Sequence, residues 1–189
     1  MKAVDPMPIT FRLAGGAQPL IVLPVFVNDR GPFAFILDTG VSLCIVTRSL
    51  VSDVGIVALA AQQGYGGGGR VSLGVGSADS IALGHAKAHG VRVGITDELL
   101  RIAATIGARV DGVLGYEFLR DFRLALDYTS QTIELAQGSS STKVSDDFGP
   151  ALPFRLAHSS KPLILFDAYV DEFRPFNFVL DTGASTTAV

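Results

Sequence analysis

The sequence repeats itself over a distance of 143 residues, and this repeat limits the folds open to the chain. Residues 11–46 align without a gap with residues 154–189, and 17 of the 36 aligned positions are identical. The longest shared block pairs residues 32–40 with 175–183 and ends both times in Asp-Thr-Gly. Solenoid units are about 20–50 residues long, so this period is that of a domain. We therefore expect one whole unit and the beginning of a second.

The boundaries of these units follow from composition. Residues 138–150 are mostly small and polar, which is typical of a linker. We assign residues 1–137 to the first unit and residues 151–189 to an incomplete N-terminal part of the second. Because a few strands cannot bury their own apolar side chains, we expect the second part to belong to a longer protein with two units.

Short runs of Val, Ile, Phe and Thr, separated by Gly and Pro, favour β-strands. Strands are predicted at 10–13, 20–27, 33–37, 70–73, 80–83, 91–95, 111–115, 123–127 and 132–136. Short helices are predicted at 47–54 and 97–106, with a helical turn at 116–120. The second helix should present Leu99, Ile102 and Ile106 on one face. The predicted fold is all-β: a closed, barrel-like unit with one or two short helices, followed by the first strands of a similar unit.

The two Asp-Thr-Gly triplets are the strongest chemical signal in the chain. One such triplet after a strand is a common kind of turn. Here Asp38 and Asp181 each follow a Pro-Phe-x-Phe-apolar-Leu strand at equivalent positions of the repeat, and Ser42 and Ser185 follow at equal spacing. A turn can be built from many residue types, so recurrence of the same ones points to chemistry.

The order of motifs resembles the retropepsin-like and pepsin-like aspartic peptidases, in particular the bacterial retropepsin-like proteins. The likeness spans residues 8–136 and 151–189. It rests on Phe35-Ile36-Leu37-Asp38-Thr39-Gly40, then Gly112-Val113-Leu114-Gly115, Phe118-Leu119 and Leu126-Asp127-Tyr128.

The resemblance implies an endopeptidase in which Asp38 and Asp181 activate a water molecule. Two carboxylates about 3 Å apart cannot both ionise, so they share one proton, as the paired aspartates of the aspartic peptidases are known to do. The ionised carboxylate is the general base and the protonated one donates to the scissile carbonyl. The substrate is then a peptide or protein, and neither a cofactor nor a metal is required.

The neighbouring residues also take roles from the resemblance. Thr39 and Thr182 would brace the two loops against each other, and Gly40 and Gly183 would permit close approach. Ser42 and Ser185 would support the loops.

Val41 and Ala184 stand where pepsin-like members often carry a hydroxyl that binds the carboxylate. Without it the ionised form is less stabilised. We therefore expect a weakly acidic to neutral pH optimum.

The family closes a β-hairpin, the flap, over its substrate. The matching stretch is rich in glycine and contains Gly64, Tyr65 and Gly66. Glycines suit a mobile lid, and these three residues are the predicted substrate-binding part of the flap.

Two alternatives remain open at this stage. The protein could be a homodimer that uses Asp38 from each chain, with residues 151–189 as an appendage. The fold could also serve as a non-catalytic peptide-binding or dimerisation module. The second unit lacks a flap and a counterpart of residues 112–115, so this length of chain alone could be inactive.

Other classes of function find little support. The net charge is −3 and no basic stripe is present, which argues against a nucleic-acid partner. No run approaches the roughly 18 apolar residues of a membrane span. His85 and His89 lack a third ligand and read as surface histidines. Cys44 is the single cysteine, so no internal disulfide forms, and it reads as a buried small side chain. Residues 1–6 show no apolar leader, so the cytoplasm is the default location, or the periplasm or exterior if a leader was removed.

Overall fold

The computed structural model describes residues 7–17, 19–66, 69–137, 149–158 and 161–187. Most of the predicted linker at 138–150 lies outside these residues. The fold is mostly β with three short helices among the described residues, as predicted. The elements are β1 (Ile9–Thr10), β2 (Arg12–Ala14), β3 (Leu20–Val27), β4 (Arg30–Leu37), β5 (Cys44–Val46), α1 (Arg48–Val54), β6 (Val57–Gly66), β7 (Gly69–Leu83), β8 (Ala86–Ile95), α2 (Leu99–Ile106), β9 (Gly112–Leu114), α3 (Tyr116–Leu119), β10 (Phe122–Asp127), β11 (Thr132–Gln137), β12 (Arg155–His158), β13 (Lys161–Ala168) and β14 (Phe176–Val179).

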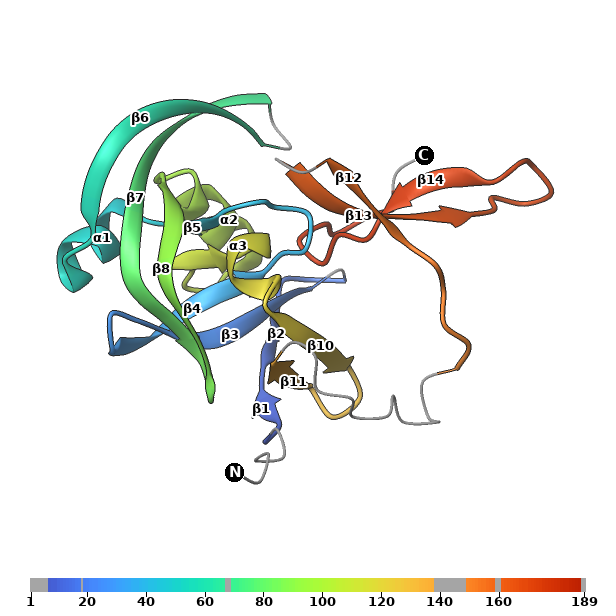
Figure 1. The fold of residues 1–189 in the computed structure, drawn as a ribbon, viewed down its shortest axis with the longest axis horizontal. Coiled ribbons are helices and arrows are strands. Elements are labelled where there is room, and N and C mark those ends of the chain that lie inside the picture. Colours follow the sequence, from blue (N-terminus) through green and yellow to red (C-terminus); the bar gives the residue numbers. More distant parts are fainter. Residues whose placement is uncertain (1–6, 18, 67–68, 138–148, 159–160, 188–189) are drawn as a thin grey trace.

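The largest sheet closes on itself. Its order is β2-β3-β4-β9-β5-β8-β7-β6, and β3 also pairs with β7. Strands β3, β4, β9, β5, β8 and β7 therefore form a ring, from which β2 and β6 extend. Figure 1 shows β7 and β6 curving round one side of the ring. The barrel-like unit expected from the sequence takes the form of this ring of strands.

Apolar side chains fill the inside of the ring. Leu20–Val27 was predicted as a buried strand and is buried along most of its length. The main core cluster contains side chains from several strands of the ring, among them Leu23 of β3, Phe35 and Leu37 of β4, Val93 of β8 and Leu114 of β9. A smaller cluster lies under α2. Close packing of these side chains fixes the strand ends from which the loops emerge.

The helix α1 has the predicted ends. The Thr47 hydroxyl accepts a hydrogen bond from the Leu50 amide at 3.3 Å, and Gly55 stops the helix with φ 72°. In α2 the predicted apolar face was wrong by one position. Leu99, Ala103 and Ile106 pack on the smaller cluster, whereas Ile102 is 37% exposed. No helix among the described residues is long and apolar enough to span a membrane.

The long hairpin arm differs most from the sequence prediction. The strands β5 and β6 were not predicted, and β7 runs unbroken where two separate strands were expected. His89, predicted to be a surface histidine, is exposed but lies in β8, paired with Ser80. Ala, Gly and Ser are frequent in β6 and β7, and their low β propensity hides strands that are held by pairing with neighbours. Strand β5 has only three residues, too few for a clear strand pattern.

The strands β12, β13 and β14 form a separate sheet beside the ring (Figure 1). Their pairing reproduces that of the first unit. Val22 pairs with Ile36 and Leu23 with Phe35 in β3–β4. The residues 143 positions later pair in the same way, Leu165 with Val179 and Phe166 with Phe178. The sequence repeat is therefore also a repeat of strand register.

A third sheet joins β1, β11 and β10 in that order. The strands β10 and β11 form the predicted hairpin around residues 128–131. The Phe11 ring packs edge-on against Tyr128, with 6.0 Å between ring centroids. The sheet lies against the ring, since β11 contacts β8 and β10 contacts α3.

Candidate active site

Strand β4 delivers Asp38 to its loop. The last three residues of the strand, Phe35, Ile36 and Leu37, are buried, so the chain can only leave the core at residue 38. Strand β9 runs parallel to β4 and pairs Leu37 with Leu114. The Asp38 amide then donates to the Leu114 carbonyl at 3.1 Å, one step beyond the ladder. The backbone of Asp38 is thus fixed by a neighbouring strand.

The segment after β9 holds the rest of the first loop. The amides of Tyr116 and Glu117 donate to the carbonyls of Val41 and Ser42 at 2.9 and 3.0 Å. A side chain at Gly115 would overlap the Leu43 carbonyl, which explains the glycine there. Ser42 therefore contacts α3 through its backbone. The equivalent residue of the second loop, Ser185, is exposed.

The second loop has the same local conformation at its aspartate. The Gly40 amide donates to Asp38 Oδ1 at 2.8 Å, and the Gly183 amide donates to Asp181 Oδ1 at the same distance. The Leu180 amide ties the end of β14 to the Ile164 carbonyl at 2.9 Å. Each carboxylate is thereby oriented by its own loop.

Two threonines join the loops through four hydrogen bonds. The Thr39 hydroxyl donates to the Leu180 carbonyl at 2.8 Å and accepts from the Thr182 amide at 3.1 Å. The Thr182 hydroxyl donates to the Leu37 carbonyl at 2.9 Å and accepts from the Thr39 amide at 3.1 Å. Each hydroxyl acts once as donor and once as acceptor, so the contact is reciprocal.

The glycines of the two loops lie against the opposite aspartates. A Cβ added at Gly40 would overlap the carboxyl group of Asp181, and one added at Gly183 would overlap that of Asp38. Any larger residue at either position would displace a carboxyl group. The absence of a side chain therefore lets the two carboxyl groups come together between the loops.

Burial and the second aspartate change the acidity of Asp38. Loss of solvent, the charge of Asp181 and a hydrogen bond with Asp181 together raise the pKa of Asp38 to about 6. Hydrogen bonds from the backbone amides of Gly40 and Val41 lower the pKa of Asp38 in part. Asp38 is half-buried, whereas Asp181 is exposed. The Asp38 carboxyl group therefore keeps its proton to a higher pH than an exposed aspartate does.

The predicted flap residues lie at the end of a long hairpin. Gly64, Tyr65 and Gly66 are the last residues of β6 and pair with Val71, Arg70 and Gly69 of β7. Residues 64–66, predicted as part of a mobile lid, are paired strand, as is Gly69. Residues 67–68 lie outside the described residues. The role of the flap toward a substrate stays a prediction.

Sequence reasoning missed the groups that support the first loop from β9 and α3. The Leu114 carbonyl and the Tyr116 amide are backbone groups, which leave no mark on residue identity. The predicted strand at 111–115 placed Asp111 at a strand end without indicating that its side chain is buried. An aspartate directly before a buried strand was the available signal.

The described residues contain no cluster of three or more His, Cys, Asp and Glu side chains suited to a metal ion. Cys44 is buried as predicted, and its burial raises the pKa of the thiol to about 11. A thiol this hard to ionise is a poor nucleophile or metal ligand. Asp38 and Asp181 are the acidic side chains that the two loops bring together.

The family model described as aspartyl protease matches residues 23–118, which is just over half of the chain. The chain belongs to this aspartyl protease family. The matched region includes the Asp38 loop, the β6–β7 hairpin and β9, in agreement with the sequence resemblance. A solved structure of a retropepsin-like aspartic protease from Rickettsia conorii is also similar. It has 16% identity and a TM-score of 0.45, and the match covers 65% of this chain and 85% of that one. The comparison with curated proteins gives no match.

Proposed function

We propose that this aspartyl protease family member is an endopeptidase that hydrolyses peptide bonds with the pair Asp38 and Asp181. The observation that carries the proposal is the reciprocal bracing of the loops by Thr39 and Thr182. A contact of this kind brings two acids from distant parts of the sequence to one place. Two carboxyl groups with one shared proton are the requirement for the reaction.

The reaction follows from the two protonation states. In the resting pair we assign the proton to Asp38, because it is the more buried carboxyl group and burial favours the neutral form. Asp181 then takes a proton from water as the water oxygen attacks the scissile carbonyl carbon. Asp38 gives its proton to the carbonyl oxygen. Collapse of the tetrahedral intermediate breaks the C–N bond: Asp181 gives its proton to the leaving nitrogen, and one hydroxyl of the intermediate returns a proton to Asp38, which restores the resting pair.

The pH dependence follows from the same assignment. With the pKa of Asp38 near 6, activity should fall as the pH rises above this value, because the proton donor is lost. Val41 and Ala184 offer no hydroxyl to stabilise the charged carboxylates. Both features support a weakly acidic optimum, and a pH–rate profile with its maximum below about pH 3 would contradict it.

The division into lobes is part of the proposal. We assign residues 1–137 to a first lobe, 138–150 to a linker and 151–189 to the opening part of a second lobe. The shared register of β3–β4 and β13–β14 supports this assignment. So does exposure: Leu37 is fully buried, whereas its counterpart Leu180 is 48% exposed. Strands that leave such residues in water lack the covering that the first lobe has.

The test is the loss of activity in Asp38→Asn and Asp181→Asn, made separately. Each variant keeps the size of the side chain but cannot exchange the proton, so kcat should fall by about a thousandfold or more. Cleavage of a mixed peptide library, read by mass spectrometry, measures turnover and shows whether internal bonds are cut. Sedimentation of the same samples gives the oligomeric state.

Three results would contradict the proposal. Loss of activity in Asp38→Asn alone, with a dimer in sedimentation, would favour a homodimer that uses Asp38 twice. Binding of peptides by the wild-type protein without turnover would favour a non-catalytic module. Full activity in both variants would place the chemistry elsewhere.

A further inference from the structure

Asp111 is a buried acid that the proposed reaction does not use. Among the described residues the buried polar or charged side chains belong to Thr47, Ser80, Thr96 and Asp111, and the last is the only acid of these. A carboxylate in such a place is costly unless it is paired. Its Oδ2 accepts from the Ala34 amide at 2.9 Å, and its Oδ1 accepts from Arg109 Nε at 2.8 Å. Arg109 itself is largely exposed.

The backbone of Asp111 makes two more links. Its amide donates to the Ala34 carbonyl at 2.8 Å, and its carbonyl accepts from the Thr47 amide at 3.0 Å. Ala34 lies in β4, four residues before Asp38, and Thr47 caps α1 directly after β5. Asp111 therefore fastens the start of β9 to both neighbouring strands.

Strand β9 has only three residues, so its register needs such an anchor. It pairs Phe35 with Gly112 at one end, and the Leu114 carbonyl accepts from the Asp38 amide at the other. A Cβ at Gly112 would overlap the Phe35 ring. A slip by one residue would therefore put a side chain on this ring and move the carbonyl that holds Asp38.

We propose that Asp111 is a positioning residue for Asp38, which fixes where β9 begins beside β4 and thereby where the Asp38 backbone lies against the second loop. The inference rests on the proposed function, because it gives Asp111 a part in the geometry of the proposed pair. Arg109 balances the charge of Asp111 from the surface and is dispensable for the placement.

The experiment compares Asp111→Ala and Asp111→Asn with the wild-type protein. The alanine variant loses the acceptor for the Ala34 amide, whereas asparagine keeps a side-chain oxygen in that place. Ile133→Val in β11 serves as a control, because it removes one methyl group from the shared core but leaves the hydrogen bonds of β4 and β9 in place. Two quantities are measured at equal folded fraction: kcat and KM for peptide cleavage, and the titration of the Asp38 carboxyl carbon by NMR.

In Asp111→Ala we expect kcat to fall about tenfold to a hundredfold with little change in KM, as for a misplaced reacting group. The Asp38 pKa should move toward its ordinary value, because the carboxyl group is less buried and farther from Asp181. Asp111→Asn should restore kcat to within about threefold of wild type, since the Ala34 hydrogen bond carries the placement and the charge does not. Ile133→Val should leave both quantities unchanged.

An Asp111→Ala protein with the wild-type Asp38 titration and kcat would overturn the inference. So would an equal shift in Ile133→Val, which would mean a general loss of rigidity. If the alanine variant does not fold, Asp111→Glu is used instead. Glutamate keeps the negative charge, but its extra methylene group shifts the carboxylate that accepts from the Ala34 amide. A wild-type kcat and Asp38 titration in Asp111→Glu would again overturn the inference. Absence of cleavage in every protein would refute the proposed function alone, since the titration still tests Asp111.

Discussion

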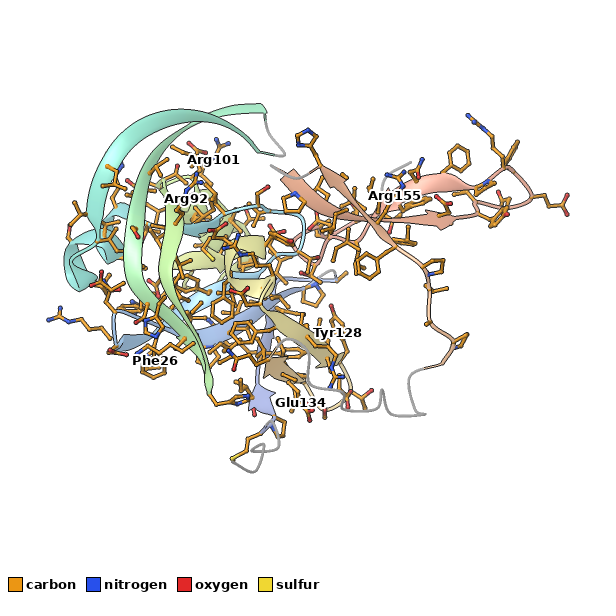
Figure 2. All side chains as sticks on the ribbon, viewed as in Figure 1. Phe26, Arg92, Arg101, Tyr128, Glu134 and Arg155 are labelled. Atoms are coloured by element: carbon orange, nitrogen blue, oxygen red, sulfur yellow. The ribbon has the colours of Figure 1, made fainter. Side chains whose placement is uncertain are left out.

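The two Asp-Thr-Gly units share their sequence, their strand register and their loop hydrogen bonds, but they differ in what covers them. In the first unit β9 lies beside β4, α3 holds the loop, and Ile36 and Leu37 are buried. In the second, the counterparts Val179 and Leu180 are 40% and 48% exposed. Figure 2 shows Arg155 in the sheet of β12, β13 and β14, where its guanidinium donates to the Asn177 side chain at 2.6 Å.

The comparison separates features that a short segment forms from its own residues from features that require contacts with distant segments. Strand pairing and the conformation of the loop are local, so both units have them. Burial requires strands from elsewhere in the sequence, and only the first unit has these among the described residues. The difference also explains why Asp38 is half-buried and Asp181 exposed.

The largest contrast should appear when the equivalent leucines are shortened. Leu37→Ala removes a fully buried side chain and should lower the free energy of unfolding by about 2–5 kcal/mol. Leu180→Ala removes a half-exposed one and should cost less than about 1 kcal/mol. Urea denaturation of both variants measures the difference. Equal losses would mean that the second sheet is as well covered in solution as the first.

Alanine at the loop glycines should test how firmly each carboxyl group is held. Gly183→Ala pushes against Asp38, which is confined, and should lower kcat about a hundredfold. Gly40→Ala pushes against Asp181, which can move into solvent, and should lower kcat only about tenfold. At Gly16 a Cβ meets no atom within 4 Å, so Gly16→Ala is the matched control and should be as active as wild type. A larger loss of kcat in Gly40→Ala than in Gly183→Ala would contradict the assignment of Asp38 as the more confined carboxyl group.

The stability of the protein should depend on pH through Asp38. Its pKa is raised on folding, so the folded state binds the proton more tightly than the unfolded state. This stabilisation is complete below the unfolded pKa of 3.8 and is lost as the pH rises to about 6. The free energy of unfolding should therefore be on the order of 2 kcal/mol greater at about pH 4 than at about pH 7, compared with Asp38→Asn measured in parallel. Identical pH dependence in both proteins would exclude this role of Asp38.

The smallest effect is expected at the reciprocal hydrogen bonds of Thr39 and Thr182, which both loops make in the same way. Thr39→Val and Thr182→Val each remove one donor and one acceptor, at a cost of about 1–2 kcal/mol to the contact between the loops. Amide exchange of residues 176–179 should be faster in both, and by similar amounts. Thr→Ser at either position keeps the hydroxyl and should exchange as wild type does. A large effect at only one threonine would break the symmetry.

Much of the first unit could be predicted because its signals are local. Leu20–Val27 is a continuous apolar run, Thr47 and Gly55 mark the ends of a helix, and the residues around 128–131 mark a hairpin. The arm formed by β6 and β7 was predicted only in part: β6 and the middle of β7 were missed, because Ala, Gly and Ser residues have little preference for a strand. Ile102 was misplaced since the periodicity alone left the choice between residues 102 and 103 open.

The candidate site divides in the same way. The repeat identified Asp38, Thr39, Gly40 and their counterparts from residue identity and spacing alone. The repeat did not identify Asp111 as a buried anchor, and its place directly before an apolar strand was the one signal, because the partner amide of Ala34 is distant in sequence and belongs to the backbone.

The sequence by itself determined the two loops, their spacing, the strands that carry them and the family to which the chain belongs. These depend on residue identity and on neighbours close along the chain. Only the tertiary structure decided that strands from distant segments close a ring, that β9 holds the backbone of Asp38, and that one aspartate is more buried than the other. Such features depend on which apolar surfaces pack against each other and so are removed from water. That packing joins segments far apart in the sequence, so local patterns do not reveal it.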